Sequence, residues 1–96
     1  MKVLWTAAAI SQLQAIHDYY AHIAPDYAKR IVDRITRRSK QIVSFPYSGQ
    51  MVPEYELSEV RQIIEGRYRI IYLIKEDRIE VLAVIHTSRD GLKPLN

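Results

Sequence analysis

The sequence predicts an α+β fold in which a two-helix hairpin packs on a mostly antiparallel four-stranded sheet. Three features favour this fold. Apolar residues recur at helical spacing in the first half of the chain, strand-like apolar runs fill the second half, and a stretch punctuated by Pro and Gly separates the halves. With 96 residues, the chain is expected to form one domain, residues 1–96, around a single core.

The first half contains a short strand and two helices. Residues 2–5 are predicted as a strand, and Thr6 as the N-cap of a helix over residues 7–23, because a threonine hydroxyl accepts from a free amide of the first turn. Pro25, which suits a first helical turn, begins a second helix that runs to about residue 43. The expected apolar stripes are Ile10, Leu13, Ile16, His17, Tyr20 and Ile23 on the first helix, and Ala28, Ile31, Val32, Ile35, Ser39 and Ile42 on the second.

The second half predicts a meander of three strands, over residues 60–65, 67–75 and 78–87. Gly66 separates the first two strands and Glu76-Asp77 the last two. Both faces of this sheet are apolar, whereas two helices cover one face. The other face is therefore expected to be an apolar surface rimmed by arginine, which marks a binding site. Strict alternation assigns Arg67, Arg69, Ile71 and Leu73 to one face of the strand over residues 67–75, and Leu82, Val84 and His86 to one face of the last strand.

Composition limits the class of protein. The chain is 48% hydrophobic and 26% charged, contains no cysteine, and has no apolar run of the ~20 residues that span a bilayer. These values predict a globular cytoplasmic protein without disulfides, thiolate metal sites or membrane segments. The net charge is +3, and residues 29–40 hold six basic residues against one acid. This basic helix face is either solvated or a nucleic-acid contact, and solvation is the more common role of such a face.

The segment VLAVIHTSRD, residues 81–90, ends an apolar strand in polar groups. His86 is a candidate acid or base, or else it ends the strand and makes local hydrogen bonds. A Ser88–His86–Asp90 triad is disfavoured, because a triad needs the histidine between the other two groups and here the serine lies in the middle; the spacing of His17, His22 and His86 likewise argues against a metal site. The acidic side chains of the central loop are interpreted as solvated: Glu54, Glu56 and Glu59.

Three segments resemble the RelE/ParE toxins of bacterial type II toxin–antitoxin systems. They are LWTAAAISQLQAIHDYY near the start, FPYSGQMVPEYE with VRQIIEGRYRIIYLI in the middle, and RIEVLAVIHTSRD near the end. The resemblance covers nearly the whole chain in the family's order and is closer to ParE. It implies a growth-inhibiting, plasmid-stabilising toxin that poisons DNA gyrase, requires no cofactor, and is neutralised in a hetero-oligomer by a ParD-like antitoxin.

The resemblance also implies candidate site residues. Those expected to bind a partner are Arg61, Arg67, Arg69, Ile71, Leu73, Leu82, Val84, His86 and Arg89. The alternative is a RelE-like ribosome-dependent mRNA endonuclease, in which Arg67, Arg69, His86 and Arg89 would serve catalysis. Thr87 and Ser88 follow His86 and no tyrosine follows Tyr72, so the tail lacks a second acid or base. A third alternative is a non-toxic module that binds an antitoxin.

Overall fold

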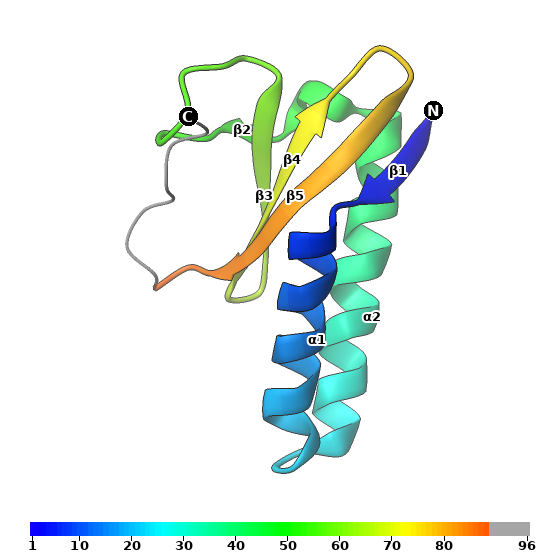
Figure 1. The fold of residues 1–96 in the computed structure, drawn as a ribbon, viewed down its shortest axis with the longest axis vertical. Coiled ribbons are helices and arrows are strands. Elements are labelled where there is room, and N and C mark those ends of the chain that lie inside the picture. Colours follow the sequence, from blue (N-terminus) through cyan, green and yellow to red (C-terminus); the bar gives the residue numbers. More distant parts are fainter. Residues whose placement is uncertain (89–96) are drawn as a thin grey trace.

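Two helices cover one face of a mixed sheet in the computed structural model, which describes residues 1–88 (Figure 1). The α+β class and the order of elements are confirmed. The helices are α1 (Ala7–Ala21) and α2 (Pro25–Gln41), followed by two 3₁₀ turns, η1 (Ile42–Ser44) and η2 (Pro46–Ser48). The strands are β1 (Lys2–Trp5), β2 (Gln50–Met51), β3 (Val60–Glu65), β4 (Tyr68–Ile74) and β5 (Arg78–His86).

The sheet has five strands in the order β1-β5-β4-β3-β2, one more than the sequence predicts. The additional strand, β2, pairs Gln50 with Gln62 and Met51 with Arg61. Two residues are too few to produce a periodic pattern, which is why the prediction missed it. β1 runs parallel to β5, and the other pairs are antiparallel.

A β-bulge at Leu82 interrupts the pairing of β5 with β4. Tyr72 pairs with Val81, but Ile71 pairs with Ala83, so Leu82 has no partner on β4. One extra residue reverses the side-chain alternation beyond it. The face assignment from strict alternation is therefore wrong past this point: Val84 lies on the helix-covered side.

Thr6 begins α1 as predicted. Its side chain accepts a hydrogen bond from the Ala9 amide at 3.1 Å and donates to the Leu82 carbonyl at 3.3 Å. The predicted stripe of α1 is only partly correct, because Ile10 is 45% exposed and Ile23 is 70% exposed. Ala9 is instead the fully buried residue of this helix. α2 packs through the predicted positions Ala28, Ile31, Ile35 and Ser39.

Hydrophobic clusters lie on both faces of the sheet. The larger one joins the helices to the sheet and contains Ile35, Ile70, Tyr72 and Val81, all fully buried. The smaller one, on the opposite face, consists of Val52, Val60, Ile71 and Ile85. Val52 belongs to the loop of residues 52–59, so this loop covers part of the face that was expected to be bare.

We expect Thr6→Ala to lower the free energy of unfolding by about 1 kcal/mol, the usual effect of removing a helix N-cap. Thr6 also donates to the Leu82 carbonyl and so ties the start of α1 to the bulge. The loss of stability should therefore not fall below this value. Thr6→Ser, which retains the hydroxyl, should be close to wild type. Urea unfolding followed by circular dichroism measures both, and equal stability of the two variants would contradict the assigned cap.

Candidate functional site

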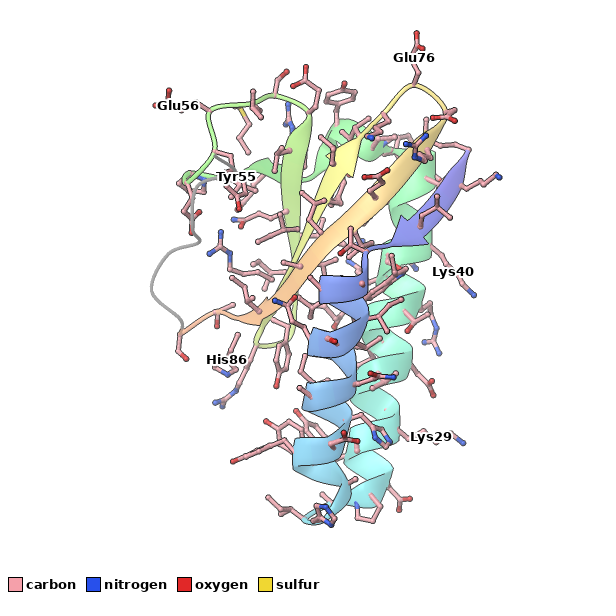
Figure 2. The ribbon with its side chains drawn as sticks, in the orientation of Figure 1. Lys29, Lys40, Tyr55, Glu56, Glu76 and His86 are labelled. Atoms are coloured by element: carbon pink, nitrogen blue, oxygen red, sulfur yellow. The ribbon has the colours of Figure 1, made fainter. Side chains whose placement is uncertain are left out.

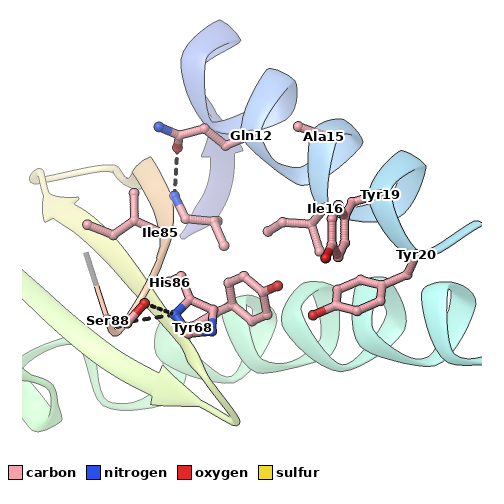
Figure 3. A pocket seen from close by; sticks show the side chains of 10 residues that line it. Gln12, Ala15, Ile16, Tyr19, Tyr20, Tyr68, Ile85, His86 and Ser88 are labelled. Carbon is pink, nitrogen blue, oxygen red and sulfur yellow. Dashed lines mark hydrogen bonds between the residues drawn. The ribbon is translucent and has the colours of Figure 1, made fainter. Parts of the chain in front are cut away.

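A groove lined by tyrosines lies between α1 and the end of β5 (Figure 3). It has a volume of about 480 Å³. We call it the tyrosine groove, and its lining residues are Gln12, Ala15, Ile16, Tyr19, Tyr20, Tyr68, Val84, Ile85, His86 and Ser88. A mixed aromatic and polar lining of this kind is typical of a binding site.

Tyr68 of β4 forms the floor of the groove. The residue is 6% exposed, and burial raises the pKa of its hydroxyl, with a further increase from the Tyr20 hydroxyl. Its ring meets the His86 ring edge-on at a centroid distance of 5.4 Å. Tyr20 also contacts Tyr19 and Tyr27 edge-on, each at 4.9 Å. These contacts fix the aromatic rings, whereas Tyr19 remains 64% exposed at the rim.

Beyond Val81, β5 has no neighbouring strand among the described residues on the side that faces α1. Pairing between β1 and β5 ends at Trp5 and Val81, after which the chain turns into α1. Over residues 82–86, which we call the open edge of β5, the contacts to α1 come from side chains. The Gln12 Oε1 accepts from the Val84 amide at 2.8 Å. Backbone groups along such an edge can pair with an added strand.

His86 makes local hydrogen bonds at the end of its strand, which is one of the two alternatives predicted for it. Its Nδ1 accepts from the Ser88 backbone amide at 3.1 Å and lies 2.7 Å from the Ser88 hydroxyl. Both contacts come from a residue two positions away and converge on one nitrogen. This arrangement closes a turn after β5 and leaves Nε2 as the ring nitrogen that is not engaged by Ser88.

Arg69 lies on the opposite face of the sheet from His86. Tyr68 pairs with His86, and Arg69 is the next residue of β4. Because successive side chains of a strand alternate, Arg69 points to the face opposite Tyr68 and His86. Its guanidinium donates twice to the Glu54 carboxylate, at 2.9 and 3.0 Å, and its Nε donates to Gln62 at 2.8 Å. The side chains of Arg69 and Glu54 are 11% and 18% exposed. The interpretation of Glu54 as a solvated loop charge is therefore wrong.

Arg61 also holds the central segment to the sheet. Its Nε donates to the Ser58 carbonyl at 2.8 Å and its Nη1 to the Gly49 carbonyl at 3.1 Å. The guanidinium lies over the Tyr47 ring, 5.2 Å from the centroid. Both Arg61 and Arg69 thus use their donors within the fold.

Comparison with known proteins decides the family. Residues 3–91 match the family model described as the ParE toxin of type II toxin–antitoxin system, parDE. The chain belongs to this ParE toxin family. It is 25% identical over 88 residues to Toxin RelE2 of Caulobacter vibrioides, an alignment that covers 92% of this chain and 97% of that protein. It also resembles a chain from the chromosomal ParDE TA system of P. aeruginosa, with a TM-score of 0.77, 25% identity, and coverage of 92% and 97% of the two chains.

The other predicted residues of this ParE-family toxin fall into separate regions. Ile71 is buried beneath the loop, with Leu73 and Leu82 packed against the same cluster. Val84 is 2% exposed on the helix side, where the bulge places it, and is not part of the arginine-rimmed face. Arg67 is exposed in the turn between β3 and β4. Arg89 lies outside the described residues.

Residues 1–88 offer neither a metal centre nor a membrane span. No group of three or more His, Cys, Asp and Glu side chains in this part of the chain is placed to hold a metal ion. None of its helices is long and apolar enough to cross a bilayer.

Sequence reasoning missed the α1 side of the tyrosine groove. The apolar stripe predicted for the first helix includes Tyr20 but not Tyr19, which is exposed at the rim of the groove. A signal was present, because consecutive tyrosines on an amphipathic helix cannot both face the core. Gln12 gave no signal, since its role depends on the Val84 amide, 72 positions away.

We expect Glu54→Gln to lower the free energy of unfolding by about 1–3 kcal/mol, because Arg69 would remain largely buried without its counter-charge. Glu56→Gln removes an exposed charge from the same loop and should change stability by less than about 0.5 kcal/mol. Urea unfolding of the two variants gives the comparison. Equal effects would mean that the Arg69–Glu54 pair does not hold the loop to the sheet.

Proposed function

We propose that this toxin inhibits DNA gyrase in the cytoplasm and acts by binding rather than by catalysis. The family match over residues 3–91 supports a ParE-like target. The observation that carries the proposal is the separation of His86 from Arg69 by the sheet, together with the engagement of Arg69 by Glu54.

Ribonuclease chemistry requires a different arrangement. Attack by a ribose 2′-hydroxyl needs an acid, a base and cations around a single phosphate. The candidate set Arg67, Arg69, His86 and Arg89 would have to meet at one point. His86 instead faces Tyr68 on the helix side, while Arg69 holds the loop on the opposite side. The mRNA endonuclease remains the second candidate because one relative is named Toxin RelE2.

The tyrosine groove and the open edge of β5 are the proposed docking site of an antitoxin. The groove supplies exposed aromatic area, and the backbone of the edge beside it is held by side chains, Gln12 and Thr6, that an added strand would displace. A helix can lay its apolar face into such a groove, and an extended segment can pair with such an edge. The similar P. aeruginosa chain comes from a ParDE system, which supports an antitoxin as the partner.

A gyrase supercoiling and cleavage assay with the purified toxin tests the target. We expect loss of supercoiling or trapped cleavage complexes, both relieved by the cognate antitoxin. His86→Ala should change the inhibitory concentration by less than about tenfold, because a contact residue contributes on the order of 1 kcal/mol, whereas loss of a general acid or base costs about 100-fold or more.

The same preparations should be added to a cell-free translation extract. Intact translation beside inhibited gyrase supports the binding mechanism. Cleaved mRNA that is abolished by His86→Ala would overturn it in favour of the endonuclease. Inactivity in both assays would indicate a non-toxic antitoxin-binding module.

Tyr19→Arg should weaken antitoxin binding at least tenfold, because it places a charge at the rim of the aromatic groove where an apolar helix face would dock. Tyr19 is 64% exposed, so the substitution leaves the core intact. The matched control is Ser11→Arg, which adds the same charge at an exposed position of α1 outside the groove. Isothermal titration with the antitoxin measures both, and equal affinities would rule out the groove as the docking site.

A further inference from the structure

The outer face of α2 carries a row of arginines that the proposed function does not use. Arg30, Arg34, Arg37 and Arg38, which we call the arginine stripe, are spaced so that they share one side of the helix. At 1.5 Å per residue, the stripe is about 12 Å long. With Lys29 and Lys40, α2 has six basic residues against Asp26 and Asp33. Figure 2 shows Lys29 and Lys40 projecting outward from α2.

The positive charge of α2 is not neutralised within residues 1–88. The ion pairs of this part of the chain involve His17, Arg69, Lys75 and Arg78, none of which belongs to α2. Arg30 lies over the Tyr27 ring at 6.0 Å, and Arg38 donates to Gln41 at 3.3 Å. Neither contact neutralises a charge, so the stripe keeps its positive charge for an anionic ligand.

The stripe ends beside two shallow hollows with a mixed polar and apolar lining. Arg34, Arg37 and Arg38 line a shallow hollow of about 190 Å³ with Gln41 and Glu65. Arg38 also borders a second hollow of about 230 Å³. Its other lining residues are Ser48, Gly49, Gln50, Gln62, Ile63 and Ile64. Hydroxyl and amide side chains beside arginine are the groups that contact phosphate and sugar in nucleic-acid complexes.

A nucleic acid fits this face better than a protein does. The large exposed hydrophobic residues of the described chain all lie outside residues 25–41, and of these Ile64 lines the second hollow. A protein interface relies on apolar or aromatic anchors at its centre, whereas a protein–DNA interface is polar and strongly positive. Arginine forks also match phosphate oxygens in pairs. Glu65 is the one acid lining the hollows, and it opposes binding locally.

We propose that the arginine stripe of α2 binds the phosphate backbone of duplex DNA without reading its sequence. The choice of DNA over RNA rests on the proposed gyrase target, since gyrase works on duplex DNA. The stripe would then give the toxin its own contact with the DNA held by its target. Backbone binding of this kind depends steeply on salt, because each neutralised phosphate releases counterions.

Fluorescence anisotropy of a labelled duplex of about 30 base pairs, titrated with the full-length toxin at several salt concentrations, tests the proposal without gyrase. Four phosphate contacts predict a loss of affinity of about 150-fold between about 50 and 200 mM salt. Arg34→Gln with Arg37→Gln should reduce that loss to about 12-fold. Glutamine is a good helix former, so α2 should persist.

The charge-matched control is Lys2→Gln with Lys75→Gln, which removes two positive charges outside α2 and should retain the wild-type salt dependence. Equal salt dependence of the two double variants would overturn the proposal. A labelled poly-glutamate chain is the second probe of the wild-type toxin. If it binds as tightly as the duplex, the stripe fits an acidic protein instead. Because gyrase is absent, failure here leaves the gyrase assay unaffected.

Discussion

The single unpaired residue at the β-bulge determines how this molecule distributes its functional groups. If β4 and β5 continued the register of the Tyr72–Val81 pair without a bulge, Arg67 would lie opposite His86. His86 would then point to the arginine-bearing face of the sheet. With the bulge, His86 pairs with Tyr68 and turns toward α1. The same shift aims the Val84 amide at Gln12. The tyrosine groove and the separation of His86 from Arg69 both follow from this irregularity.

The two faces of the sheet consequently have different roles. On the helix side, α1 and the open edge of β5 form an aromatic groove, and the Val84 amide of this edge is bound by the Gln12 side chain. On the opposite side, Arg69 and Glu54 fasten the loop of residues 52–59 over a small apolar cluster. A buried guanidinium is costly unless it is paired, so this arginine is committed to the fold. The molecule is built to present surfaces to partners, which suits a toxin that acts by binding.

Local signals in the sequence predicted most of the fold. The strand bounds 2–5 and 60–65 match the structure, and Thr6 caps α1 as expected, because capping and periodicity depend on near neighbours. The bulge could not be predicted, since the run VLAVI is apolar at every position and gives no sign of a reversed face. The Arg69–Glu54 pair joins positions 15 apart through a loop whose path has no local signature. The way these residues assemble could therefore not be predicted, and the partner-binding roles assigned to them stay predictions.

The most direct test of this account is a set of nuclear Overhauser contacts from the His86 ring in the isotopically labelled toxin. The structure predicts contacts from His86 to the ring protons of Tyr68, whose centroid lies 5.4 Å away, and none to Arg69. Contacts from His86 to the Arg69 side chain would place both groups on one face. They would contradict the bulge, and with it the argument that this toxin binds its target without catalysis.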